Sequence, residues 1–344
     1  MKILNFVRTS SITDEKLDRF CTYILPRKHN YIRKLILDTT YMERILLAGN
    51  YPNVSYLELF NFKQEIILHN FTENSVFRHI FQHQITDLIL HNNDEFIFVV
   101  TLLRRMTHLE KLTLYLRILK RHIFDADTSP YVDGTYLQNE ILVHMSQLHT
   151  FKFYISTETR INYSIFRISG DDIRQTFTNI KYGQTACIID DFGEFGTTCH
   201  VYSLPFTFTR LEKITTHFPF TVFDTVTHLS VRDFVPFEHE FFMRISQAFP
   251  LLKCFSINNW QMQYRNCNDN SSYSVIEFTH LISLNMVTRL PRLTQLKVNY
   301  YDLKSVTMNF TRDETSHNCS KVNRLIVGKS ITFSKDFHQY FPLL

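Results

Sequence analysis

Two segments of this chain carry residue types that could bind a metal ion or a phosphate. His79 and His83 are four residues apart on an expected helix, a spacing that can bind a divalent metal ion. No Glu follows His79 and the sequence suggests no third ligand, so we expect ordinary surface histidines. Gly328-Lys329-Ser330 has the end of a phosphate-binding loop, but Asn323 stands where the first Gly of that motif belongs. The sequence therefore predicts no metal site and no cofactor.

Paired carboxylates occur twice and could take part in proton transfer. Asp190 and Asp191 could supply half of a general acid–base pair, but they open a glycine-containing turn, where we expect solvated side chains. Asp171 and Asp172 follow Ser169 and fit a helix N-terminus, where carboxylates suit the helix dipole. Since no Ser, His and Asp or Cys and His order stands out, we predict no catalytic residue and expect that the chain is not an enzyme.

The cysteines and the N-terminus bear on the compartment. The six cysteines lie at least 12 residues apart, so we expect reduced thiols and no disulfide framework. Lys2, Asn5 and Arg8 interrupt the N-terminal segment before an apolar run develops, unlike a signal peptide. The apolar stretch 96–103 is shorter than the roughly 20 residues of a membrane span. These features predict a cytoplasmic or nuclear protein.

The charge of the chain is nearly balanced. Of its 344 residues, 37 are Lys or Arg and 33 are Asp or Glu, a formal net charge of +4. Such a balance argues against binding nucleic acid or a membrane through bulk charge. Aromatic residues make up 15%, with 32 Phe, while Gly numbers only 7. The chain therefore has much apolar surface to bury and few tight loops.

A short apolar pattern recurs along the chain. Each copy is six residues long and has apolar residues at its first, fourth and sixth positions. The nine copies span 32–37, 54–59, 85–90, 109–114, 148–153, 226–231, 252–257, 293–298 and 322–327. Short strands with room for a helix between them predict parallel strands joined by right-handed crossovers, all in one curved sheet.

The segments between the copies have helical patterns, expected at 41–48, 94–106, 135–145 and 236–249. The fold class predicted is therefore α/β, a leucine-rich-repeat-like solenoid or horseshoe with a curved, mainly parallel sheet and helices on the convex side. Residues 1–30 are expected to form an N-terminal capping region, with one helix at 14–25 packed on the first strand, and residues 31–344 the degenerate repeat solenoid.

Two places interrupt the repeat. The copies that start at Leu148 and Val226 are separated by 78 residues, and two β-type runs around a glycine-containing turn predict an irregular hairpin insert near 183–205. A further apolar pattern at 281–286 starts only 12 residues before Leu293. Because this leaves too few residues for a helical crossover, strands at 284–286 and 296–298 cannot both be ordinary neighbours.

Residues that alternate with the apolar positions should line the concave face of the sheet. On that face, acidic residues occur only in the first three copies, and Lys or Arg occurs in five of the other six. Tyr and Arg are typical interface anchors. The candidate protein-binding residues are Tyr56, Glu58, Asp87, Lys111, Tyr115, Lys152, Tyr154, Arg232 and Lys297.

Three further segments strengthen a resemblance to a known family. Together with the degenerate Leu/Phe strands, these segments resemble the leucine-rich-repeat half of F-box proteins from an expanded invertebrate family. The segments are Phe249-Pro-Leu-Leu252, Val235-Pro-Phe-Glu-His-Glu-Phe-Phe242 and Asp336-Phe-His-Gln-Tyr-Phe-Pro342. The resemblance covers roughly residues 12–344. It implies a substrate-recognition module of a ubiquitin ligase. The Leu-Pro-x-Glu pattern that opens an F-box is absent before Ile32, so we expect no binding of a Skp-type adaptor.

Three functions remain open from the sequence. The leading one is a non-enzymatic module that binds an unknown protein target through the concave face. The second is an orphan structural or inhibitor-like repeat protein that blocks its target and has no ubiquitin-ligase link. The third is an RNA-binding solenoid that uses Lys111, Lys152, Arg232, Lys297 and Arg324, whose binding would weaken steeply with salt.

Overall fold

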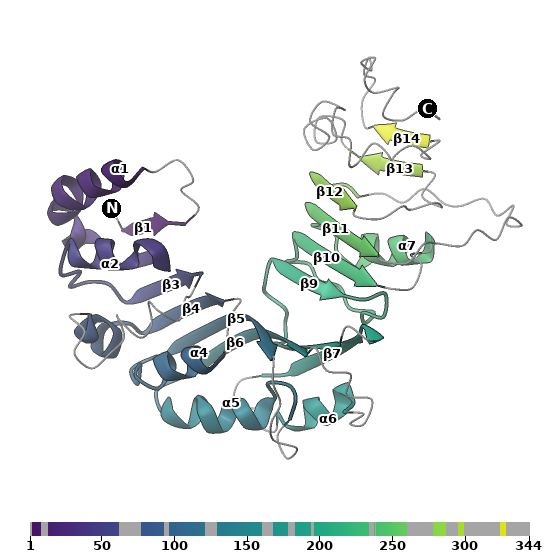
Figure 1. Cartoon of the computed structure of the whole chain (residues 1–344), viewed down its shortest axis with the longest axis horizontal. Coiled ribbons are helices and arrows are strands. Elements are labelled where there is room, and N and C mark those ends of the chain that lie inside the picture. Colours follow the sequence, from purple (N-terminus) through teal and green to yellow (C-terminus); the bar gives the residue numbers. More distant parts are fainter. Residues whose placement is uncertain are drawn as a thin grey trace, which may run out of the picture. The chain divides into compact units, whose positions relative to one another are not determined.

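The chain divides into two compact units. The computed structural model describes residues 2–7, 13–61, 77–92, 96–120, 129–159, 168–177, 183–193, 196–233, 237, 239–259, 278–286, 295–298 and 324–327 (Figure 1). Unit 1 comprises Met1–Ile189 and Gly193–Pro205, and unit 2 comprises Asp190–Phe192 and Phe206–Leu344. Among the described residues, no helix is long and apolar enough to cross a bilayer.

Unit 1 is a mixed α/β structure built on an eight-stranded, mostly parallel sheet. The strand order is β1-β2-β3-β4-β5-β6-β8-β7. Neighbouring strands from β1 to β6 pair in parallel, whereas β6 and β8 pair antiparallel. The strands are β1 (Ile3–Phe6), β2 (Lys34–Asp38), β3 (Tyr56–Phe60), β4 (Asp87–Asn92), β5 (Lys111–Lys120), β6 (Thr150–Thr159), β7 (Thr185–Asp191) and β8 (Thr197–Ser203). The last two residues of β7, Asp190 and Asp191, belong to unit 2.

Helices lie between the strands of unit 1, and three of them, α2, α5 and α6, begin at side-chain caps. The main helices are α1 (Asp14–Arg19), α2 (Thr39–Leu47), α4 (Phe96–Leu103), α5 (Gly134–Glu140) and α6 (Gly170–Gln175), and short helical segments span Phe20–Ile24, Leu25–Arg27, His29–Tyr31, Ile80–Gln84 and Leu142–His144. The Asp38 carboxylate caps α2 by accepting from the Thr40 N–H, so this helix begins earlier than the predicted 41. Asp133 caps α5 through the Tyr136 N–H.

The core of unit 1 lies between the sheet and these helices. Along β2 and β3 the residues alternate between fully buried leucines and more exposed positions, as a strand with one covered face requires. Leu35 and Leu37 belong to the same buried cluster as Met42 of α2, Val100 of α4 and Leu137 of α5. Figure 1 shows α2, α4 and α5 along the same face of the sheet.

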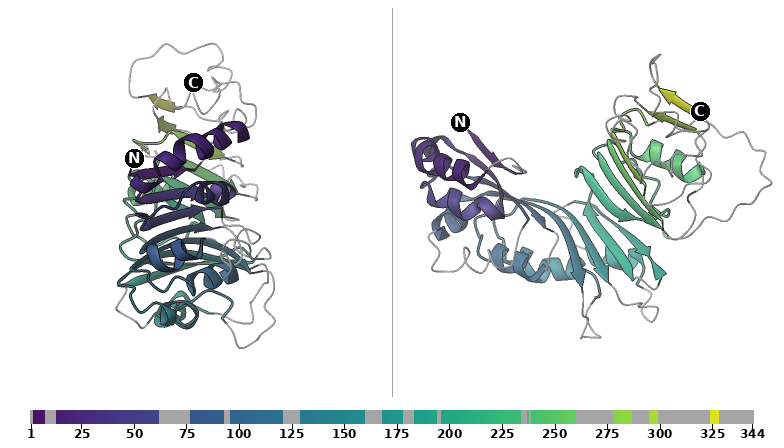
Figure 2. Two further views of the ribbon diagram at one scale, coloured as in Figure 1. Left: turned by 90° about the vertical axis from the view of Figure 1, so that its left-hand side faces the viewer. Right: turned by 45° about the horizontal axis from the view of Figure 1, so that its top comes forward.

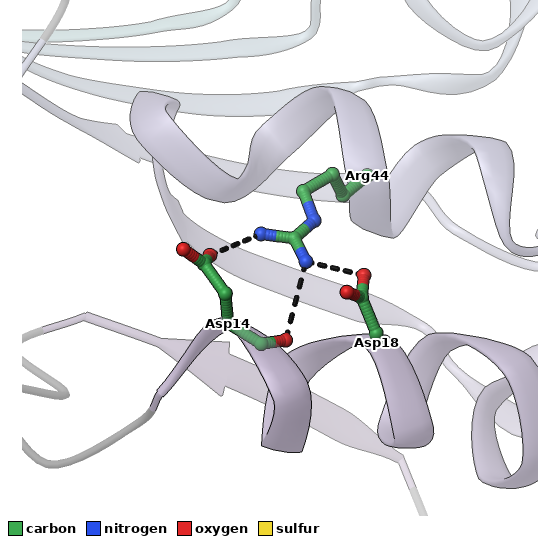
Figure 3. Close-up of polar contacts among 3 residues, drawn as sticks. All are labelled: Asp14, Asp18 and Arg44. Carbon is green, nitrogen blue, oxygen red and sulfur yellow. Dashed lines mark hydrogen bonds and ion pairs between the residues drawn. The ribbon is translucent and has the colours of Figure 1, made fainter.

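The predicted N-terminal helix is confirmed as a helical run from α1 to Arg27. It covers β1, a strand that the sequence analysis missed: the Phe20 ring lies 5.1 Å from the Phe6 ring. Arg44 of α2 reaches two carboxylates of α1 (Figure 3). Its guanidinium is 2.6 Å from Asp14 Oδ1 and also pairs with Asp18. The N-terminal region therefore covers the β1 end of the core.

Unit 2 carries two further parallel sheets. The four-stranded sheet has the order β12-β11-β10-β9, and the two-stranded sheet contains β13 and β14. The elements are β9 (Arg210–Ile214), β10 (His228–Asp233), α7 (His239–Ala248), β11 (Cys254–Asn259), β12 (Ser283–Met286), β13 (Gln295–Val298) and β14 (Arg324–Val327). As expected from the short spacing, β12 and β13 are not neighbours in one sheet.

All nine predicted strands exist and pair in parallel, but the prediction of one sheet is wrong. They are divided among three sheets. The predicted hairpin strands near 183–205 are β7 and β8, and β8 pairs antiparallel with β6. This reversal ends the parallel order after β6, and β7 then occupies the edge of the sheet.

The sequence pattern also missed β9, for a physical reason. Its register with β10 shifts between Ser230 and Val231, so that Glu212 and Ile214 face successive residues. Lys213 is the extra residue, with a left-handed φ of 58°. The bulge delays the third apolar residue by one position, and the hexapeptide pattern is lost.

One backbone contact recurs in both units and marks equivalent positions. The carbonyl just before one strand accepts hydrogen bonds from two successive N–H groups at the start of the next strand. In unit 1, Arg33 O accepts from Ser55 and Tyr56, and Ser55 O accepts from Thr86 and Asp87. In unit 2, Thr227 O accepts from Lys253 and Cys254 in the same way. The recurrence indicates one repeated strand geometry.

Candidate functional site

The face of the eight-stranded sheet opposite the core is here called the open face. It carries the residues that alternate with the buried leucines and phenylalanines of β2 to β6. The buried cluster on the other face includes Leu17, Ile80 and Ile173 from helical segments of unit 1. Figure 2 shows the strands of this sheet side by side from two directions.

A row of rings crosses the open face from β3 to β8. Phe60, His91, Tyr115 and Tyr154 stand at aligned positions of successive strands. The Phe60 and His91 rings stack at 4.1 Å, His91 and Tyr115 lie 5.9 Å apart, and Tyr115 and Tyr154 stack at 5.0 Å. His200 of β8 extends the row, at 5.9 Å from the Tyr154 ring. Offset rings at such distances attract each other.

Glu58 joins this ring row to the neighbouring positions. Its Oε1 is 2.9 Å from His91 Nε2, and its Oε2 accepts the Tyr56 hydroxyl at 2.8 Å. Burial alone would raise the pKa of Glu58, but the hydrogen bonds from His91 and Tyr56 and the charges of His91 and Lys34 outweigh it and lower the pKa. Burial also raises the pKa of Tyr56, with a further contribution from its bond to Glu58.

The strand starts form a polar pocket beside this group. The pocket has a volume of about 250 Å³ and is lined by two successive residues at the start of each of four neighbouring strands. These residues are 33–34, 55–56, 86–87 and 110–111. Lys34 Nζ lies 4.4 Å from the centre of the Tyr56 ring, a cation–π contact. Burial raises the pKa of Asp87, while the charges of Lys111 and Lys34 oppose this effect.

The exposed charged side chains of β2, β5 and β6 on this face are lysines. Lys34, Lys111 and Lys152 are exposed, whereas the Glu58 side chain is only 17% exposed and is held by two partners. Asp87 is half-buried. An approaching molecule therefore meets lysine ammonium groups along the strands, and Glu110 is an exposed carboxylate in the lining of the polar pocket.

Seven of the nine predicted binding residues lie on this single face. These are Tyr56, Glu58, Asp87, Lys111, Tyr115, Lys152 and Tyr154. Arg232 is in unit 2, where its guanidinium lies 5.4 Å from the Phe192 ring. Lys297 occupies a position of β13, and Arg324 one of β14; both strands belong to unit 2.

Two of these residues are not available for surface contact. We expected Tyr115 and Tyr154 to line an accessible face, but they are 7% and 0% exposed. Stacked neighbours cover them on both sides, and the Tyr154 hydroxyl lies 3.0 Å from His200 Nδ1. Since β8 lies beside β6, the antiparallel hairpin buries this end of the ring row.

Sequence reasoning missed His200 and did not select His91, Phe60 or Lys34 as binding residues. His91 and Phe60 stand at the same position of the repeat as Tyr115 and Tyr154, so the repeat register could have identified them. His200 comes from an antiparallel strand outside the repeat. No local pattern places it beside Tyr154.

The residues considered for chemistry have mostly structural roles. Asp190 is not solvated as expected: it is 1% exposed and accepts hydrogen bonds from the Thr215 N–H at 3.1 Å and from the Thr215 hydroxyl. Ser169 and Asp172 form the N-terminal cap of α6. The Gly328-Lys329-Ser330 segment and Asn323 lie outside the described residues.

His79 and His83 have their rings 5.6 Å apart, and His108 lies the same distance from His83. Across the described ranges, no group of three or more His, Cys, Asp or Glu side chains could hold a metal ion. The sulfur atoms of Cys187 on β7 and Cys199 on β8 lie 3.6 Å apart and form no disulfide bond.

Comparisons with known proteins do not place this chain in a family. No protein-family model matches the sequence. No curated protein matches it either. The class of protein defined so far is a mixed α/β protein with a mostly parallel sheet and one open, ring-bearing face.

Proposed function

We propose that the chain is a non-enzymatic protein-binding module and that the open face of unit 1 holds its partner. The observation that carries this proposal is the group of half-buried rings on β3 and β4, namely Tyr56, Phe60 and His91, with exposed lysines on neighbouring strands of the same face. Phe60, Tyr56 and His91 are partly accessible and held in place by stacking and hydrogen bonds. Preorganised aromatic side chains lose little freedom on binding and make effective interface anchors.

The charge of the face selects the partner's chemistry. Lys34, Lys111 and Lys152 are exposed, while Glu58 is shielded by His91 and Tyr56. A partner segment with carboxylates for the lysines and apolar or aromatic side chains for the rings would be complementary. The proposed partner is therefore an acidic protein segment that lies across β2 to β6.

The repeated strand-start contact supports a repeat architecture for the chain. The finer proposal is a leucine-rich-repeat-like solenoid, since such arrays use an open strand face for binding. Its leading use is substrate recognition like that of F-box receptors, and the alternative is an inhibitor-like module with no ubiquitin-ligase link. A pull-down with a purified Skp-type adaptor separates the two uses.

Charge reversal on the open face tests the proposal. The full chain with Lys34→Glu and Lys152→Glu should lose proteins that the wild type retains in an affinity purification. Lys16→Glu with Lys28→Glu is a matched control, because both lysines are exposed in the helical N-terminal region. Direct binding of each retained protein is then measured with purified components. Equal binding by the open-face variant and the control would refute this surface as the binding site.

The same assay decides between a protein and an RNA partner. A protein partner should survive nuclease treatment and bind with a modest salt dependence. Retention that disappears after nuclease treatment, with affinity falling steeply with salt, would favour the RNA-binding alternative instead.

A further inference from the structure

A second cavity lies on the helix side of unit 1. It has a volume of about 390 Å³ and is lined by residues of α5, β6 and β7 and of the segments next to them, including Thr176 and Phe177 directly after α6. Volumes of 300–1,000 Å³ are typical of small-molecule sites. Lys152 of the open face lies between Phe151 and Phe153 of this cavity on β6, so the two sites use opposite faces of one strand.

The cavity has an apolar floor and an accessible rim. Leu137, Phe151 and Phe153 are buried and form the floor, whereas Phe177 is half-buried and Gly183 is exposed. The Phe153 ring stacks on Phe151 at 4.9 Å and on Phe177 at 5.6 Å. Parallel aromatic surfaces of this kind favour a flat apolar guest.

One polar group of the lining lacks a partner. The side-chain oxygen of Gln138 is buried and accepts no hydrogen bond from any described residue. In contrast, the Thr176 hydroxyl accepts from the Gly134 N–H at 2.8 Å and donates to the Ile173 carbonyl at 2.7 Å. Leaving a buried acceptor unpaired costs free energy, so a donor that reaches Gln138 would be bound favourably.

We propose that this cavity, here called the Gln138 pocket, binds a small, flat, apolar molecule that carries one N–H or O–H donor. The ring of the ligand packs among Phe153, Phe177 and Leu137. Its donor bonds to Gln138 Oε1. The site is independent of the protein-binding face, because it lies on the other side of β6.

Indole and 1-methylindole are matched probes for this proposal. Both are flat and apolar, but only indole has an N–H donor. Titration calorimetry with the full chain should show indole binding about tenfold more tightly, the effect of one hydrogen bond to a buried acceptor. Gln138→Leu should remove this preference and leave 1-methylindole binding little changed, because it removes the acceptor and keeps an apolar lining. Asn139→Leu, an exposed neighbour on the same helix, is the control that should retain it.

A second variant tests the site in case Gln138→Leu fails to fold. Leu142→Trp adds bulk at the half-buried wall of the Gln138 pocket and should abolish binding of both probes, with the far-ultraviolet circular dichroism unchanged. No binding of indole to the wild type would overturn the proposal. Equal affinity of the two probes, or an unchanged preference in a folded Gln138→Leu variant, would also overturn it.

Discussion

The Glu58 carboxylate on the open face makes the stability of unit 1 depend on pH in the acid range. Its pKa is lowered in the folded protein, so its hydrogen bonds stabilise the fold above the unfolded value of about 4.3 and this contribution is lost as pH falls through the folded value. We expect Glu58→Gln to lower the free energy of unfolding near pH 7. The same variant should lose less stability than the wild type between about pH 5 and about pH 3, as measured by urea unfolding.

Glu15→Gln is the matched control for this experiment, since Glu15 is exposed on α1. Its pH profile should follow the wild type. A Glu58→Gln profile parallel to that of the wild type would show that His91 and Tyr56 do not hold the ionised carboxylate.

Tyr154 separates packing from hydrogen bonding in the ring row. Tyr154→Phe keeps the stacking with Tyr115 and removes the contact of the hydroxyl with His200, which should cost about 1 kcal/mol. Tyr154→Ala also removes a fully buried ring and should cost about 3–5 kcal/mol. Chemical denaturation measures both values. Equal losses for the two variants would contradict the stacked arrangement.

At the scale of elements, α1 is held mainly by apolar burial rather than by its ion pairs. Asp14 and Asp18 are 88% and 67% exposed, so solvent screens their attraction to Arg44. Asp18→Asn should therefore cost less than about 1 kcal/mol. Leu17→Ala should cost about 2–5 kcal/mol, because Leu17 is only 1% exposed. Urea unfolding compares them, and a larger loss for Asp18→Asn would reverse this ranking.

The start of α5 depends on a close approach to the end of α6. A methyl group at Gly134 would overlap the backbone of Thr176 and lie 2.7 Å from the Phe177 nitrogen. Gly134→Ala should therefore destabilise the chain by about 1–3 kcal/mol, although alanine is the better helix former. Gly193→Ala tests instead whether a left-handed backbone requires glycine. The added methyl group meets no atom within 4 Å, but the φ of Gly193 is 59°. A neutral Gly134→Ala would show that the two helices can separate.

At the scale of the whole molecule, the two compact units should unfold in separate steps. Unit 1 has its own buried cluster, and in unit 2 the rings of Phe223 and Phe249 stack at 5.2 Å in the core. In differential scanning calorimetry, Leu112→Ala should lower one transition and Phe249→Leu the other. A single transition that both substitutions shift equally would show that the units unfold together.

The sequence by itself determined the local elements of this protein. The apolar hexapeptides identified nine strands, and the Ser169 and Asp172 pair identified the start of α6, because side-chain alternation and capping depend on residues close in the chain. The repeat register also brought seven predicted binding residues to one face. The β9 strand escaped the pattern because the bulge at Lys213 shifts its third apolar position. The β1 strand was overlooked although it fits the pattern, since Leu4 and Phe6 stand opposite Leu35 and Leu37 of the next copy.

Only the tertiary structure decided how the strands are divided and which face residues stay accessible. Strand pairing depends on contacts between distant segments, and the antiparallel pairing of β6 with β8 ends the parallel order that a repeat alone would continue. The same pairing places His200 beside Tyr154, and both side chains are buried. The Gln138 pocket likewise depends on how α5 and α6 approach the sheet, since packing of distant side chains sets the size of a cavity.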